Sequence, residues 1–244
     1  MLQTVTHLDT LGWYHILVFS ILVPYLAIRS RKRIMAANAP PLNRLKRFQS
    51  TTFGLVLLGT LSVLTARTHA INLFHRGVTT PGVAIPAAIA MYVVAVVLMR
   101  PRWRRAVEKR VRVVYLFMPT NTRERVWWIA VSTLAGISEE ITWRGVQPVV
   151  LAAALGSSTA AVMISAIAFG IAHMTQGWRT AGVVCLFALG FQTLVWLSGS
   201  LYLAMLVHLA YDVTAGLTYG RLGRELGYQV DVGVTAPSMA GTGL

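Results

Sequence analysis

The chain has 244 residues, of which 55% are apolar and only 12% are charged, and its formal net charge is +14. Soluble domains carry about 25% charged residues, so this composition excludes an ordinary soluble enzyme and indicates a polytopic membrane protein. The basic residues flank apolar segments, where membrane topology and anionic lipids account for them, so nucleic acid is not an expected partner. The single cysteine, Cys185, excludes an intrachain disulfide and a cysteine-rich metal site.

Apolar segments long enough to cross about 30 Å of hydrocarbon follow one another along the chain. They are predicted at 11–28, 48–66, 81–99, 126–144, 157–175, 179–198 and 200–218. A shorter run, 146–156, spans only about 17 Å at about 1.5 Å per residue, and we expect it to cross as an eighth span after a sunken turn near Gly145. The prediction is an all-α bundle of about eight spans in one membrane domain, 1–224, with a loose tail at 225–244.

The distribution of basic residues predicts the orientation. Two strongly basic segments follow the first and third spans, whereas the loop between the second and third spans carries few basic residues. Positive-inside bias therefore puts both basic segments in the cytoplasm and the N-terminus outside, and we expect 101–112 to lie on the membrane surface as an amphipathic helix. With eight spans, the segments that carry Glu139, His173 and His208 run in the same direction, and Glu139 lies nearer the outer face. If 146–156 did not cross, the C-terminal arginines would become cytoplasmic but His173 would move away from Glu139, so the crossing is favoured.

Three ionisable residues, Glu139, Glu140 and Arg144, lie within one apolar segment. Each ionised side chain in hydrocarbon costs about 2.5–3.5 kcal/mol on insertion scales, so such a cluster indicates partners, a water-filled cavity or chemistry. Residues four apart share a helix face, which predicts an ion pair between Glu140 and Arg144. Glu139 points about 100° away, which leaves its carboxylate able to take a proton from water.

Two later apolar segments add histidines. Phe169 and His173 are four residues apart, as are His208 and Asp212, so we expect Asp212 to accept a hydrogen bond from His208 and fix its tautomer. Glu139 and His173 together could activate a water molecule, and His208 could donate to the oxyanion formed when that water attacks an amide. Phe169 is expected to pack against the site. Four histidines lie at span edges or in loops and are given no role: His7, His15, His69 and His75.

The three motifs Glu139-Glu140-x-x-x-Arg144, Phe169-x-x-x-His173 and His208-x-x-x-Asp212 resemble, in order and spacing, those of the type II CAAX prenyl endopeptidases. This family of intramembrane glutamic proteases includes the Ras-converting enzyme and bacteriocin-processing relatives. The resemblance covers a core of about residues 122–218 and implies an eight-helix endopeptidase.

The resemblance also implies roles for individual residues. The first glutamate and the second-motif histidine of the family activate water, which by match are Glu139 and His173. The third motif usually ends in asparagine, whose amide helps to bind the oxyanion, so the role of Asp212 here is open. No metal cofactor is expected, although two histidines and two carboxylates make zinc the less favoured alternative.

The predicted function is an intramembrane endopeptidase that cuts near the C-terminus of a membrane-anchored or lipidated substrate. Two alternatives stay open: a non-catalytic immunity or scaffold protein of the same fold, and a proton-coupled transporter, since intramembrane Glu, His and Asp also form proton relays. The expected location is the plasma membrane, with anionic lipid at the basic loops.

Overall fold

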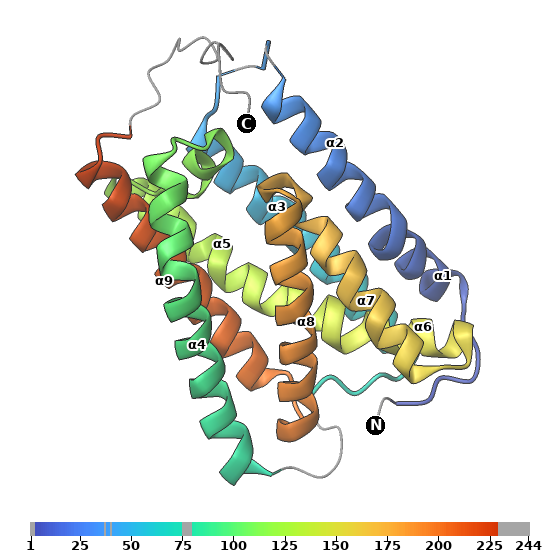
Figure 1. Ribbon diagram of the computed structural model, residues 1–244. Helices are drawn as coiled ribbons and strands as arrows, with labels where there is room; N and C mark the ends of the chain where they lie inside the picture. The colour runs from blue at the N-terminus through green and yellow to red at the C-terminus, as the bar shows by residue number, and fades with distance from the viewer. Residues whose placement is uncertain (1–2, 37, 40, 75–79, 229–244) are drawn as a thin grey trace, which may run out of the picture.

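The computed structural model describes residues 3–228 except 37, 40 and 75–79, and every regular element in these residues is helical (Figure 1). The prediction of an all-α protein is confirmed. Short π-helical or 3-10 segments at Val18–Leu22, Arg112–Phe117, Ile141–Val146 and Met174–Gln176 lie between the helices. The helices are α1 (Thr10–Leu17), α2 (Val23–Met35), α3 (Arg44–Thr68), α4 (Pro81–Glu108), α5 (Thr122–Glu140), α6 (Gln147–Leu155), α7 (Ser158–Ala172), α8 (Trp178–Ser198) and α9 (Tyr202–Glu225).

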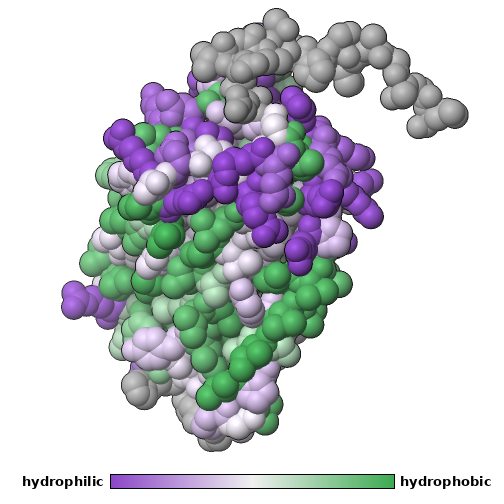
Figure 2. Space-filling model, turned by 90° about the vertical axis from the view of Figure 1, so that its left-hand side faces the viewer, coloured by the Kyte–Doolittle hydropathy of each residue, from purple (hydrophilic) through white to green (hydrophobic). Residues whose placement is uncertain are grey.

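Large apolar side chains cover the outside of the bundle, while hydrophilic side chains gather at one end (Figure 2). Helix α4 illustrates this pattern, because Val93, Val97 and Leu98 are all exposed. Four helical stretches are long and apolar enough to cross a membrane, namely Thr10–Met35, Arg44–Thr68, Pro81–Glu108 and Trp178–Ser198, and α7 is a shorter apolar helix. The chain is therefore an integral membrane protein, but the predicted count of eight spans is not confirmed.

The chain does not reverse direction near Gly145, before the run 146–156, as expected. The backbone stays helical from α5 through the segment Ile141–Val146 into α6, and the chain reverses only at Gly156, which caps α6 in the left-handed conformation with φ of 67°. Glycine adopts this conformation without a Cβ penalty, whereas Gly145 lies inside a hydrogen-bonded π turn. Helix α6 thus extends the path of α5, and α7 returns beside it (Figure 1).

This path reverses the expected direction of α7 and α9 relative to α5. Arg224 near the end of α9 donates to the carbonyl oxygen of Thr120, just before α5, at 3.5 Å. The C-terminal arginines, which eight spans would have put outside, therefore lie at the same end as the basic segments, in agreement with the positive-inside rule. Glu139 and His173 nevertheless meet, because the chain reverses at Gly156, which lies midway between them in sequence. The helical stretches before and after Gly156 have the same length, so they bring the two residues side by side.

The segment 101–112 is not a separate surface helix. Helix α4 continues to Glu108, and Trp103 and Val107 are buried against a cluster that includes Met118 and Leu222. The apolar face that suggested contact with lipid instead packs against the end of α9 and the chain that precedes α5.

The prediction of a loose tail at 225–244 is wrong for residues 225–228. Helix α9 reaches Glu225, and the buried Tyr228 hydroxyl donates to the carbonyl oxygens of Arg110 and Val111 at 3.0 and 3.2 Å. Burial raises the pKa of Tyr228 to about 12, so the hydroxyl keeps its proton. The rest of the predicted tail, 229–244, lies outside the described residues.

Two glycines allow close approach of the helices that carry the three motifs. A Cβ at Gly136 in α5 would lie 2.9 Å from the carbonyl oxygen of Met205 in α9, and one at Gly170 in α7 would lie 2.7 Å from that of Ala181 in α8. Small residues at helix contacts are the usual way in which membrane helices pack closely. The contact at Gly136 brings His208 of α9 within reach of the glutamates of α5.

Candidate active site

The π-helical segment Ile141–Val146 follows the two glutamates directly. Its hydrogen bonding includes the Gln147 N–H donating to the Thr142 carbonyl, five residues back. The next donor in that series would be residue 148, which is proline and has no N–H, so the Trp143 carbonyl needs another partner. Ser165 of α7 supplies it, with its hydroxyl 2.9 Å from the Trp143 oxygen. A single bond thus ties the His173-bearing helix to the segment that follows Glu139 and Glu140.

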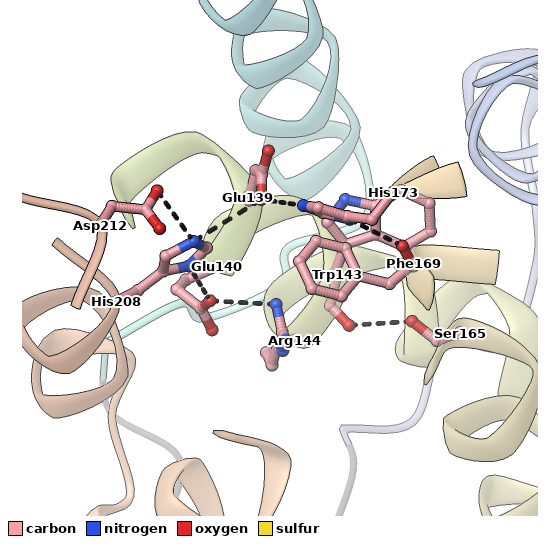
Figure 3. Close-up of polar contacts among 9 residues, drawn as sticks. All are labelled: Glu139, Glu140, Trp143, Arg144, Ser165, Phe169, His173, His208 and Asp212. Carbon is pink, nitrogen blue, oxygen red and sulfur yellow. Dashed lines mark hydrogen bonds and ion pairs between the residues drawn. The ribbon is translucent and has the colours of Figure 1, made fainter. Parts of the chain in front are cut away.

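Glu140 is the buried centre of the site. Its Oε1 lies 3.0 Å from Nη1 of Arg144 and 2.7 Å from Nδ1 of His208 (Figure 3). The side chains of Glu140 and Arg144 are 0% and 1% exposed, so the predicted i,i+4 pair is confirmed and fully buried. The Arg144 guanidinium also lies 4.3 Å from the ring centroid of Phe169 and 5.0 Å from that of Phe191, and cation–π attraction is strongest when such a cation is desolvated.

The expected hydrogen bond from His208 to Asp212 is wrong. His208 Nδ1 bonds to Glu140, while Nε2 lies 3.7 Å from Asp212 Oδ2, too far for a hydrogen bond. The reason is that α9 packs closely on α5, so a carboxylate from the neighbouring helix comes nearer than the one on the same helix. The backbone of Asp212 takes part in this packing, because its carbonyl accepts a hydrogen bond from Trp128 Nε1 at 2.9 Å.

Glu139 lies between the two histidines. Its Oε2 is 4.0 Å from His173 Nε2 and 3.8 Å from His208 Nε2 (Figure 3). His173 Nδ1 lies 2.9 Å from the Phe169 carbonyl oxygen, which can only accept, so Nδ1 carries the hydrogen. In neutral His173 the lone pair of Nε2 therefore faces Glu139. Glu139 Oε2 is buried and makes no hydrogen bond to the described residues, and a buried polar atom of this kind commonly binds water.

Solvent reaches one side of this cluster only. The side chains of Glu139, His173 and Asp212 are 21%, 23% and 28% exposed, in contrast to the sealed pair of Glu140 and Arg144. The two adjacent glutamates thus have different surroundings, as the spacing of the arginine suggested. Glu140 is held by an arginine and a histidine, whereas Glu139 lies between two imidazoles and its side chain is partly exposed.

A metal site would need several ligating side chains placed around one centre, and the candidate site can be compared with that geometry. Among the side chains that the structure describes, no group of three histidine, cysteine, aspartate or glutamate residues is arranged to hold a metal ion. Zinc requires its nitrogen and oxygen ligands at about 2.0–2.2 Å from a shared centre. Metal independence of the site stays a prediction.

His15, which received no role from the sequence, is fully buried and hydrogen-bonded to two distant residues, Gln147 and Ser62. The sequence contained one signal for this cluster: a histidine inside the first apolar segment, together with polar residues in three other apolar segments. Of the remaining histidines, His69 has its Nε2 3.3 Å from Asp9 Oδ1, and His75 lies outside the described residues.

The comparisons with known proteins agree with the motifs. Residues 121–214 match the family described as type II CAAX prenyl endopeptidase Rce1-like, and this region contains all the candidate site residues. No curated protein and no solved structure matches the chain. The resemblance expected from the motifs is confirmed, and residues 121–214 carry the Rce1-like signature of the type II CAAX prenyl endopeptidases.

Proposed function

We propose that this protein is an intramembrane endopeptidase that hydrolyses a peptide bond near the C-terminus of a membrane-anchored or lipidated substrate. The observation that supports it most is the placement of the buried Glu139 Oε2 within 4.0 Å of two imidazole nitrogens, in a side chain that is 21% exposed. The family match supports protease chemistry at this site.

Water activation follows from the placement of Glu139 and His173. The 4.0 Å between Glu139 Oε2 and His173 Nε2 is too long for a direct hydrogen bond, and a single water molecule can contact both atoms. Both are acceptors, so they would orient the two hydrogens of that water and leave its oxygen lone pair directed at a substrate carbonyl. Glu139 takes one proton as general base, and the resulting carboxylic acid can deliver it to the leaving amine.

His208 is the proposed oxyanion donor. Its Nδ1–H is held by Glu140, so its Nε2 can donate only when the ring is an imidazolium. Three carboxylates, those of Glu139, Glu140 and Asp212, lie within 4.0 Å of this ring and would stabilise that charge. Arg144 pairs with Glu140 at 3.0 Å and thereby supports His208 indirectly.

Access is proposed from the basic end of the bundle. His173 ends α7 and is followed by the Met174–Gln176 turn, where the Thr175 carbonyl accepts from Arg31 Nη1 at 3.5 Å. Arg31 belongs to the basic end of α2, which the positive-inside rule places in the cytoplasm. This replaces the expectation that Glu139 lies nearer the outer face, and it suits a lipidated substrate whose C-terminal tail is cytoplasmic. Anionic lipid is the proposed partner of the basic end, and the plasma membrane the proposed location.

Peptide cleavage by the purified protein is expected to be independent of metal. The assay uses protein reconstituted in lipid vesicles and a fluorogenic peptide that carries a farnesylated cysteine three residues before its C-terminus. The cleavage rate should be unchanged by a strong chelator, and the purified protein should contain no stoichiometric zinc. Loss of cleavage on chelation with recovery on adding zinc would overturn the glutamate–water mechanism. A peptide of the same sequence without the lipid is the control for substrate class.

Asp212→Asn is expected to retain or raise the cleavage rate. Asparagine restores the amide donor that the related motif usually carries, and it removes a carboxylate that competes with the oxyanion for His208 Nε2, 3.7 Å away. The measurement is kcat and KM of the variant and the wild type with the farnesylated probe. A loss of kcat comparable to that of a Glu139 variant would instead make the carboxylate of Asp212 essential.

A further inference from the structure

A second buried polar cluster lies behind the candidate active site and joins the N-terminal part of the chain to it. His15 in α1 has Nδ1 2.7 Å from Gln147 Oε1 and Nε2 3.0 Å from Ser62 Oγ. Ser62 Oγ lies 2.7 Å from Thr142 Oγ1, and Gln147 Nε2 donates to Ser20 Oγ at 2.7 Å. His15, Ser62 and Gln147 are all 0% exposed.

One assignment of hydrogens satisfies the contacts of His15. Gln147 Oε1 can only accept, so His15 Nδ1 carries the hydrogen and Nε2 accepts. The hydroxyl of Ser62 accepts from the hydroxyl of Thr142, and its one hydrogen is shared between Nε2 and the Leu58 carbonyl oxygen, each at 3.0 Å. Leaving one such buried donor or acceptor unpaired costs about 1–3 kcal/mol, so this chain of bonds strongly favours a single arrangement of the three segments.

His15 is linked to both ends of the π-helical segment, directly to Gln147 and through Ser62 to Thr142. Thr142 lies at the start of Ile141–Val146, and Gln147 is the first residue after it. In an α-helix, residues five apart are rotated by about 140° about the helix axis. In a π-helix, the backbone hydrogen bond joins residues five apart, so their side chains lie closer to the same face. The contacts from His15 to Gln147 and from Ser62 to Thr142 therefore fit the π register.

The register of this segment determines where the active-site carboxylates point. Glu140 directly precedes the segment and Arg144 lies within it, so a change to the α register would rotate one relative to the other and shift Glu140 against His208. An aromatic series adds a second link: Phe19 packs on Trp143 at 5.4 Å, Trp143 on Phe169 at 5.4 Å, and Phe169 on His173 at 4.6 Å, between ring centroids.

We infer that His15 is a positioning residue: through Gln147, and through Ser62 to Thr142, it holds the segment 141–146 in the π register and so sets the geometry of Glu139, Glu140, His173 and His208. The geometric part of this inference is independent of the reaction. Its consequence for turnover rests on the proposed function, and the experiment separates the two.

The first measurement is spectroscopic and needs no activity. Protein labelled with ¹⁵N in its histidine rings is placed in lipid nanodiscs, and the signals of His173 and His208 are assigned from their loss in glutamine variants. In His15→Phe, which keeps a ring but removes both nitrogens, these signals should move from their wild-type positions. In Tyr228→Phe, which removes a buried hydroxyl at the other end of α9, they should stay. Unmoved signals in a folded His15→Phe variant would overturn the inference.

The second measurement is cleavage of the farnesylated probe at equal amounts of folded protein. His15→Phe should lower kcat by about 10²-fold, since a misplacement of about 1 Å has that effect, while KM changes little. His15→Asn, which can still donate to Gln147, should recover part of the loss. If His15→Phe does not fold, Ser62→Ala removes the link between His15 and Thr142 but keeps the bond from His15 to Gln147, and it should change the ring signals and kcat in the same direction. A wild type that does not cleave the probe would reject the proposed function, and the ring signals would still decide the role of His15.

Discussion

Glu139→Gln is expected to lower the rate of cleavage of the farnesylated probe by about 10²–10⁴-fold, the usual contribution of a general base. Glutamine has the same shape but cannot take a proton from water. The melting temperature in detergent should be close to that of the wild type, because Glu139 Oε2 makes no hydrogen bond to the described residues and the side chain is partly exposed. The measurement is the cleavage rate in vesicles together with thermal unfolding of the same preparation.

Glu108→Gln is the matched control, since Glu108 is an exposed glutamate that pairs with an arginine at the basic end. It should leave both cleavage and melting unchanged. Full cleavage by a folded Glu139→Gln variant would remove the catalytic assignment. A wild type without cleavage would instead favour one of the two alternatives, and a scaffold or immunity protein should keep its function in Glu139→Gln.

The sequence predicted the local features of the site well, because they depend on spacing within one helix. The pairing of Glu140 with Arg144 follows from their separation of four residues, and the structure has it at 3.0 Å. The apolar segments likewise gave the helices, since length and composition alone determine which stretches can cross a membrane. The family resemblance was carried by these same local spacings.

The relations between helices were predicted less well. The direction of α7 and α9 depended on whether the chain reverses at Gly145 or at Gly156, and both are glycines near apolar runs. The reversal occurs at Gly156 because Gly145 lies within a π turn that continues the helix up to Pro148. Pro148 leaves the Trp143 carbonyl without a backbone donor, and Ser165 supplies the hydrogen bond instead. Such a contact lies more than twenty residues away in sequence and has no local signal.

The partners of the histidines show the same limit. His208 was assigned to Asp212 by its spacing, yet its hydrogen bond goes to Glu140 on another helix. His15 was given no role because its partners, Ser62 and Gln147, lie in segments that no spacing rule connects to it. Helix packing at glycines such as Gly136 decides these contacts, and a sequence pattern within one helix does not report it.

Arg144→Ala is expected to lower the free energy of unfolding by about 3–5 kcal/mol, because it leaves Glu140 buried without its arginine partner. The two side chains are 1% and 0% exposed, so water cannot replace the lost contact. The variant also loses the packing of the guanidinium against Phe169 and Phe191. The measurement is thermal unfolding in detergent, where a melting temperature lower by on the order of 10 °C is expected.

Arg104→Ala is the matched control for this effect, since Arg104 and Glu108 form the same i,i+4 pair with side chains that are 63% and 42% exposed. Solvent-exposed pairs contribute about 0–1 kcal/mol, so this variant should unfold close to the wild type. The double variant Glu140→Leu with Arg144→Met should recover most of the stability, because replacing both buried charges with apolar groups is often neutral or stabilising. It should not recover cleavage, because His208 then has no carboxylate at Nδ1 to hold its ring. Equal melting temperatures for Arg144→Ala and Arg104→Ala would contradict the buried pair, and restored cleavage in the double variant would show that His208 does not depend on Glu140.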